Sequence, residues 1–282
     1  MAVVCHDAGA ANHIVAFMRA NMHYDFKPAM FGPARKIWDA AFPNGAIFES
    51  IQSALAGSKV LLSGTGWQTP LEHLARKAAN EAGIKSIAVL DHWVNYKERF
   101  NWNGDILYPN EFWVFDQYAF AIANKAFPNY VIRQLPNLYL DELVGCIPKT
   151  RHETSDILYV LEPIRDNWGS LISGEFQALD FFYSKLDSIP LAKNGIIRLR
   201  LHPSEAPEKY SKWIAKYIDL NIEIDQSSNL GEAISMANCV IGCESYALVV
   251  ALHAGKKVYS SLPINAPPLR LPYADIIELR RL

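Results

Sequence analysis

The fold of this chain is decided by IIRLRLHPSEAPEKY at residues 196–210 and by CVIGCESYALVVALHAGKKVYSSLP at residues 239–263. Ile196–Leu201 is a short run of apolar residues and arginines, which predicts a β-strand. Cys239–Gly242 predicts a second, buried strand, and Tyr246–His253 predicts the helix that follows it. Strands that alternate with helices in this way indicate a parallel sheet with helical crossovers.

Polar residues follow both strands, directly before the predicted amino end of a helix. His202 and Pro203 come after the first strand, and Glu244 and Ser245 come after the second. Ligands of open α/β sheets bind at the carboxyl ends of the strands, and the amino ends of helices attract phosphate. These residues are therefore candidates for a binding site. The alternative is that His202 and Ser245 only cap the helices that follow them.

The alternation of strand and helix patterns continues along the whole chain. We therefore predict an α/β fold with two Rossmann-like domains that face each other across a cleft. The stretch CIPKTRHETSD at residues 146–156 is polar and has no periodicity, so we place the domain boundary there. The predicted domains are residues 1–150 and residues 151–282.

Composition excludes several classes of protein. The 282 residues are half apolar and carry a net charge of −2, so no basic excess indicates a nucleic-acid partner. No apolar run approaches the roughly 18 residues of a membrane-spanning helix, although peripheral contact with a membrane stays compatible with the sequence. The chain begins MAVVCHDAG, which predicts a strand rather than a signal peptide, and its four cysteines lack CxxC spacing. We expect a cytoplasmic protein with reduced thiols.

Strands in the first half of the chain also end in polar residues. His6 and Asp7 follow the first predicted strand, and Asp91 and His92 follow a later one. A carboxylate at such a position can act as the general base that removes a proton from a hydroxyl group, so Asp7 and Asp91 are catalytic candidates. Their alternative role is helix capping. His6 and His92 are candidates for handling water or transferring a proton.

Aromatic and cationic residues alternate in the aperiodic loop after Asp91. Trp93, Tyr96 and Arg99 lie in this loop, and Trp67 follows another predicted strand. Aromatic rings stack on the apolar faces of sugars, and arginine pairs with acidic sugars, so these residues and His6 are predicted to bind an acceptor. The alternative is a loop that buries its own aromatic side chains.

Two patterns predict structure rather than chemistry. The run Thr69-Pro70-Leu71-Glu72 matches a capping box with proline at the first helical position, which assigns Glu72 to its own helix. Arg198 and Arg200 alternate with apolar residues, and an edge strand accounts for two arginines on one face.

A family resemblance rests on two motifs of the second half. The segment R-x-H-P-S-E and the later segment A-x-x-V-I-G-x-x-S-x-A-L-x-x-A-L-x-x-G-K-K-V together resemble the donor half of GT-B glycosyltransferases, over residues 155–265. The bacterial sialyltransferase, polysialyltransferase and Kdo-transferase group is the most similar. The resemblance implies that His202, Pro203 and Ser245 hold the phosphate of a nucleotide sugar.

The same resemblance extends to other residues. It implies that the loop carrying Arg165 reaches the nucleotide, and that residues 1–150 form the acceptor side and supply an acidic base. The chain lacks the D/E-D/E-G triplet of that group, and Asp7 within HDAGA is its nearest match. Glu244 either accepts ribose hydroxyls or only favours the helix dipole, and Ser228 either touches phosphate or caps the next helix.

We therefore expect a metal-independent, inverting glycosyltransferase of surface polysaccharide biosynthesis. It would move a sugar, by resemblance a CMP-linked acidic sugar, from a nucleotide to a glycan or a small-molecule acceptor. No Asp-x-Asp sequence is present to bind a metal and diphosphate, so no cofactor is expected. One alternative is a nucleotide-sugar hydrolase or 2-epimerase of the same fold. Another is a non-catalytic binding module of polysaccharide assembly.

Overall fold

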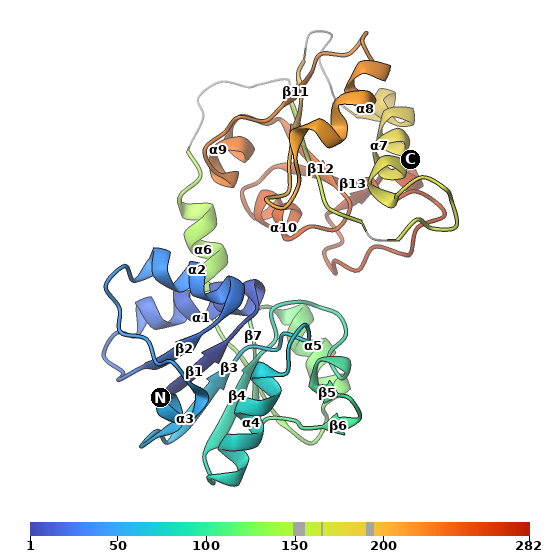
Figure 1. The fold of residues 1–282 in the computed structure, drawn as a ribbon. Helices are drawn as coiled ribbons and strands as arrows, with labels where there is room; N and C mark the ends of the chain where they lie inside the picture. Colours follow the sequence, from blue (N-terminus) through green and yellow to red (C-terminus); the bar gives the residue numbers. More distant parts are fainter. Residues whose placement is uncertain (149–155, 165, 190–194) are drawn as a thin grey trace. The chain divides into compact units, whose positions relative to one another are not determined.

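The computed structural model describes residues 1–148, 156–164, 166–189 and 195–282. It divides the chain into two compact units, unit 1 (Met1–Asp141) and unit 2 (Glu142–Leu282), each with its own six-stranded parallel sheet (Figure 1). The predicted α/β fold with two Rossmann-like domains is confirmed. Within the predicted boundary at residues 146–156, residues 149–155 lie outside the described part of the chain.

The sheet of unit 1 contains a topological switch point. Its strands are β1 (Ala2–Cys5), β2 (Lys27–Met30), β3 (Val60–Ser63), β4 (Lys85–Val89), β7 (Glu111–Val114) and β8 (Val131–Gln134). They are parallel neighbours in the order β2-β1-β3-β4-β7-β8. The chain builds outward from β1 in one direction and from β3 in the other. Ligands of open α/β sheets bind at the carboxyl ends of such a strand pair.

Helices cover both faces of this sheet because side chains of a strand alternate between faces. Val3 and Cys5 of β1 pack in the same apolar cluster as α1 (Ala8–Ala20) and α2 (Gly32–Ala41). Ala2 and Val4 pack on the other face with α3 (Ile51–Leu55) and α4 (Leu71–Glu81). The remaining elements are the hairpin of β5 (Asn101–Trp102) and β6 (Asp105–Ile106), α5 (Gln117–Ala126), and α6 (Leu138–Gly145), which spans the division at Asp141.

The sheet of unit 2 has the strand order of a dinucleotide-binding fold. Its strands are β9 (Ile157–Val160), β10 (Ile197–Arg200), β11 (Ile222–Ile224), β12 (Cys239–Gly242), β13 (Lys257–Ser260) and β14 (Ile277–Glu278). They lie in the order β11-β10-β9-β12-β13-β14, so β9 and β12 flank the switch point. The helices are α7 (Gly174–Ser184), α8 (Ser211–Lys216), α9 (Leu230–Ser235) and α10 (Tyr246–His253). Within the described ranges, no helix is both long and apolar enough to cross a membrane.

The prediction of an edge strand for Arg198 and Arg200 is wrong. Their strand, β10, pairs with β9 on one side and β11 on the other. Both guanidinium groups instead have carboxylate partners: Arg198 lies 3.8 Å from Asp156, and Arg200 donates to Asp225 at 2.5 Å. Paired charges make two arginines tolerable in an inner strand.

Candidate functional site

Asp7 leaves β1 at the switch point of unit 1 and caps α1. Its Oδ2 accepts a hydrogen bond from the N–H of Ala10 at 3.2 Å. Burial first, and then the negative charge of Asp91, raise the pKa of the Asp7 carboxyl above its usual range. A carboxylate with a raised pKa is a stronger base, so capping and a catalytic role are compatible in this residue.

Asp91 follows β4 and is paired with a cation. Its Oδ1 accepts from Arg99 Nη1 at 2.9 Å, and both side chains are about nine-tenths buried. The same Nη1 lies 3.3 Å from the hydroxyl of Thr65, which in turn donates to the carbonyl of Val89 at 2.8 Å. Arg99 therefore joins residues that follow β3 and β4.

The absence of a side chain at Gly9 lets the two aspartates converge. A Cβ atom at Gly9 would lie 1.9 Å from Asp91 Oδ2 and 3.3 Å from Asp7 Oδ2. Both carboxyl groups therefore pack against the same glycine in the first turn of α1. The structure thus brings together the two residues that the sequence offered as alternatives for the base.

Glu72 was missed as a residue of this site. Its carboxyl is fully buried, and its Oε1 accepts from the N–H of His6 at 2.7 Å and from that of Asp7 at 3.4 Å. Burial raises the pKa of Glu72. The predicted capping box is wrong, because Pro70 is the N-cap of α4 and no side chain caps this helix. Glu72 turns instead toward the loop between β1 and α1.

His6 directly precedes Asp7 in the chain, and its imidazole lies against Gly32. A Cβ atom at Gly32 would lie 2.4 Å from its Nε2, so the ring packs directly on that glycine. Within the described residues, the imidazole has no hydrogen-bond partner, and it is only partly buried. The ring nitrogens of His6 are therefore available to a ligand.

The aromatic residues of the predicted acceptor site separate into two groups. Trp67 is exposed over about half of its surface, and the guanidinium of Arg99 lies 5.8 Å from its ring. Trp93 and Tyr96 are buried, and Trp93 Nε1 donates to Asp116 at 2.9 Å. These two residues form the inside of their loop and offer no free face to a sugar.

His92 is held by the turn that follows β4. Its Nδ1 accepts from the N–H of Trp93 at 3.0 Å, and the two rings meet edge to face. This bond fixes which ring nitrogen faces the backbone.

Glu162 is the residue that the sequence gave no reason to single out in unit 2. It follows β9, and its Oε1 accepts from the N–H groups of Cys243 (3.0 Å), Glu244 (2.8 Å) and Ser245 (2.9 Å). The hydroxyl of Ser245 caps α10 by accepting from the N–H of Ala247 at 3.2 Å. The turn between β12 and α10 is therefore bound to a carboxylate of the same chain.

A cavity of about 370 Å³ opens beside this turn. Glu244 and Arg270 both line it, and Arg270 Nε donates to the Glu244 carboxylate at 3.0 Å. The described residues contain no group of three or more His, Cys, Asp or Glu side chains that could hold a metal ion. The cavity is lined by Glu162, Pro163, Ile164, Asp166, Trp168, Glu244, Leu262, Pro267 and Arg270.

The residues of the predicted HP motif are exposed. His202 follows β10, and its Nδ1 lies 2.7 Å from the hydroxyl of Ser204, which leaves Nε2 facing outward. Pro203 is exposed as well, and the expected helix begins only at the 3₁₀ turn Pro207–Tyr210. Arg165, the predicted loop arginine, lies outside the described residues.

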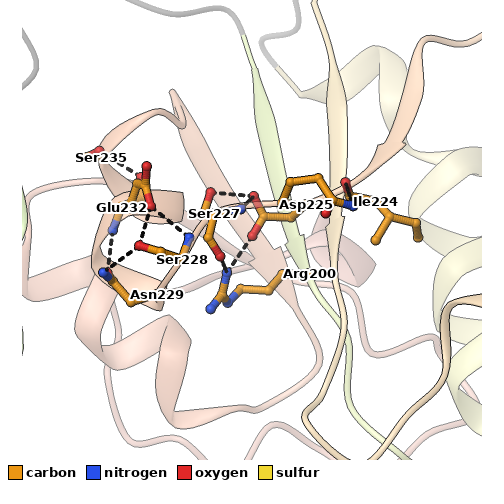
Figure 2. Close-up of polar contacts among 9 residues, drawn as sticks. Arg200, Ile224, Asp225, Ser227, Ser228, Asn229, Glu232 and Ser235 are labelled. Carbon is orange, nitrogen blue, oxygen red and sulfur yellow. Dashed lines mark hydrogen bonds and ion pairs between the residues drawn. The ribbon is translucent and has the colours of Figure 1, made fainter.

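Ser228 takes part in the capping of α9. Figure 2 shows its hydroxyl and its N–H directed at Glu232, to which they donate at 2.7 and 2.8 Å. Asn229 is the N-cap of that helix. On the other side of the network, Arg200 binds Asp225, which also accepts from the hydroxyl of Ser227. The hydroxyl of Ser228 is thus engaged within the chain.

Comparisons with known proteins bear on the fold of the chain. No protein-family model matches it, and no curated protein sequence does either. Among solved structures, it is similar to S. aureus MnaA with UDP (TM-score 0.59, 11% identity, covering 92% of this chain and 78% of that one). A Listeria monocytogenes protein assigned as a UDP-N-acetylglucosamine 2-epimerase is similar too (TM-score 0.60, 11% identity, covering 92% and 78%). These similarities support a GT-B type of fold.

Proposed function

We propose that this chain is a glycosyltransferase of the GT-B type that moves a sugar from a nucleotide donor to a hydroxyl group of an acceptor. The observation that carries the proposal is the pairing of Asp7 and Asp91 against Gly9 at the switch point of unit 1. Burial and the charge of Asp91 raise the pKa of Asp7, which suits it to accept a proton.

In the proposed reaction, Asp7 takes the proton of the acceptor hydroxyl while the hydroxyl oxygen bonds to the anomeric carbon of the donor. The bond from that carbon to the phosphate oxygen breaks, and its electron pair leaves with the phosphate. Attack on the face opposite the leaving group inverts the anomeric centre. The ion pair of Asp91 and Arg99 holds one negative and one positive charge in place near Asp7, the base.

The acceptor would contact Trp67 and Arg99. Trp67 has an exposed ring for the apolar face of a sugar, and Arg99 lies over that ring. His6 adds an imidazole without an internal partner in the described structure, which can bind a second hydroxyl.

Unit 2 would bind the nucleotide part of the donor. His202 projects Nε2 outward after β10, with Pro203 next to it, and Ser245 lies at the amino end of α10. The UDP in the similar MnaA structure supports a uridine nucleotide, and the motif resemblance supports a CMP-linked acidic sugar. We propose that no metal takes part, because His202 and the amino end of a helix can neutralise a leaving phosphate.

A second candidate function is epimerisation or hydrolysis of a nucleotide sugar. It is favoured by the imidazole of His6, which has no hydrogen-bond partner among the described residues and could transfer a proton without an acceptor sugar. The fold similarity to 2-epimerases is compatible with it. Consumption of the donor in the absence of any acceptor would favour this candidate over transfer. A third candidate is a non-catalytic binding module. Substitution of Asp7 and Asp91 without any effect on turnover would favour it.

The binding step can be tested before any acceptor is known. We would measure the thermal stability of the wild type and of His202→Ala with CMP, UDP, GDP and ADP. A ligand at about 100 times its Kd stabilises the folded protein by about 2.7 kcal/mol, which shifts the melting temperature visibly. We expect one nucleotide to stabilise the wild type and His202→Ala to lose that shift. No shift with any of the four nucleotides would contradict the proposed donor site.

A further inference from the structure

The amino end of α10 already holds an anion that belongs to the chain. One oxygen of Glu162 accepts the N–H groups of Cys243, Glu244 and Ser245, all within 3.0 Å. Successive N–H groups of a turn such as this one form a concavity that can bind an anion, phosphate included. A ligand that placed a phosphate oxygen here would compete with Glu162 for the same three donors.

Glu162 can meet a ligand because it lines the cavity of about 370 Å³ in unit 2. Trp168 and Arg270 line the same cavity, together with the carboxylates of Asp166 and Glu244, so it combines an aromatic ring with charges of both signs. The guanidinium of Arg270 is paired with the carboxylate of Glu244. The cavity therefore suits a polar ligand, but the carboxylate of Glu162 already accepts the N–H groups of the adjoining turn.

The surroundings of Glu162 disfavour its ionised form. Burial has the largest effect and raises the pKa of Glu162, and repulsion by Glu244 raises it further. The three N–H hydrogen bonds lower it, but the net result is a pKa of about 7. Arg270 is the positive charge among the groups described around it. The titratable and charged groups that face Glu162 are Tyr159 on β9, Asp166 in the following loop, Cys243 and Glu244 in the β12–α10 turn, and Arg270.

We propose that Glu162 is an internal competitor for the anionic group of the ligand of unit 2, and that the cavity admits a phosphate only when a proton neutralises this carboxylate. The proposal rests on the proposed function in one respect, namely that unit 2 binds a phosphate-bearing donor. It adds a residue that sets both the specificity and the pH dependence of that site. Binding of the phosphate is then coupled to the uptake of one proton.

This coupling has a measurable sign. Above the pKa of about 7, the free protein has an ionised Glu162, and each bound anion requires one proton from solution. The Kd for the anion then rises by about tenfold per pH unit, as linkage requires for one proton. Below that pH the proton is already bound, and the Kd becomes independent of pH.

The experiment uses sulfate as the probe, because sulfate does not titrate in the neutral range and carries no base or sugar. Its binding to the full chain would be measured by calorimetry at about pH 6 and about pH 8, on either side of the pKa of Glu162. We expect the wild type to bind about tenfold more weakly at pH 8 than at pH 6. Glu162→Gln should bind equally at all of these pH values, and more tightly than the wild type at pH 8.

Glu244→Gln is the matched control, because it removes a charge from the same turn and leaves the carboxylate of Glu162 in place. It should keep the pH dependence, moved to lower pH by the loss of repulsion. If Glu162→Gln does not fold, calorimetry of the wild type in buffers of different ionisation enthalpy still counts the protons taken up. We expect one proton per sulfate at pH 8.

Two results would overturn the proposal. One is a sulfate affinity of the wild type that does not change with pH and equals that of Glu162→Gln. The other is the absence of sulfate binding to either protein at every pH. If sulfate behaves as expected but no nucleotide sugar is turned over, the proposed function fails and the role of Glu162 stands. Turnover together with pH-independent sulfate binding removes the role of Glu162 alone.

Discussion

Each unit places a glutamate on backbone N–H groups beside its switch point, yet the two glutamates differ in what surrounds them. In unit 1, Glu72 accepts the N–H groups of His6 and Asp7, and it is sealed from solvent. In unit 2, Glu162 accepts three N–H groups of the β12–α10 turn and lines a cavity. The same interaction therefore fixes a turn in a closed interior in unit 1 and borders a cavity in unit 2.

The difference separates two kinds of site. In unit 1, Glu72 fixes the turn, and Asp7 and Asp91 converge on Gly9. In unit 2, Glu162 lines a cavity, so on our proposal its charge determines whether an anionic ligand can bind there. On this account unit 1 supplies the chemistry of the reaction, and unit 2 supplies the binding of the donor.

The largest effect is expected from Asp7→Asn. Asparagine caps a helix as well as aspartate does, so the fold should persist while the base is lost. We expect turnover to fall by about 10²–10⁴-fold, with the affinity for the nucleotide unchanged. Asp116→Asn is the control, because Asp116 caps α5 in the same way. Equal losses in both variants would contradict a specific role of Asp7 in turnover.

Gly9→Ala tests the convergence of the two aspartates. A Cβ atom would lie 1.9 Å from Asp91 Oδ2, so that carboxylate must move. We expect turnover to fall by up to about 10²-fold, the effect of a misplacement near 1 Å. Gly145→Ala serves as the control, because no atom lies within 4 Å of the added carbon. Turnover that survives Gly9→Ala intact would exclude a joint role of Asp7 and Asp91.

Removal of each glutamate by alanine should affect stability unequally. Glu72→Ala leaves two N–H groups unsatisfied in a sealed interior, which is expected to lower the free energy of unfolding by about 2 kcal/mol or more. Glu162→Ala opens its N–H groups to a cavity that water can enter, so we expect a loss of less than half as much. Urea unfolding of both variants measures the difference. Equal losses would remove the distinction between the two sites.

The pH dependence of stability should show whether Glu162 binds its proton more tightly in the folded state. The pKa of Glu162 is about 7 in the folded protein against 4.5 ordinarily, so the folded state holds the proton more tightly. Its stability therefore falls as pH rises from 4.5 to about 7, and changes no further above that. We expect the melting temperature of Glu162→Gln, relative to the wild type, to rise across this window. If the difference between the two melting temperatures does not change with pH, the pKa of Glu162 is not raised in the folded protein.

The sequence is sufficient to predict the strand ends of both units. Asp7, Asp91 and Ser245 each follow an apolar run that became a parallel strand, so local patterns were enough to bring them to ligand-facing edges. The capping of α10 by Ser245 is equally local.

The two glutamates could not be found in this way, because their partners lie far along the chain. Glu72 binds the N–H of a residue 66 positions earlier, and Glu162 binds one 81 positions later. Only the strand order makes these residues neighbours. Glu162 lies two residues after the buried strand Ile157–Val160, with Leu161 between them, so no local pattern singled it out. Strand order cannot be read from the sequence, which is also why β10 was wrongly predicted to be an edge strand.

The most direct test of the central claim is the release of free nucleotide from a nucleotide sugar. We would incubate the wild type and Asp7→Asn with UDP-N-acetylglucosamine and with a CMP-linked sialic acid, with and without glycan acceptors, and follow the free nucleotide over time. The account predicts that the wild type releases nucleotide from one donor, and that Asp7→Asn is slower by about 10²-fold or more. A donor that binds but is never cleaved, or is cleaved equally by both proteins, would contradict it.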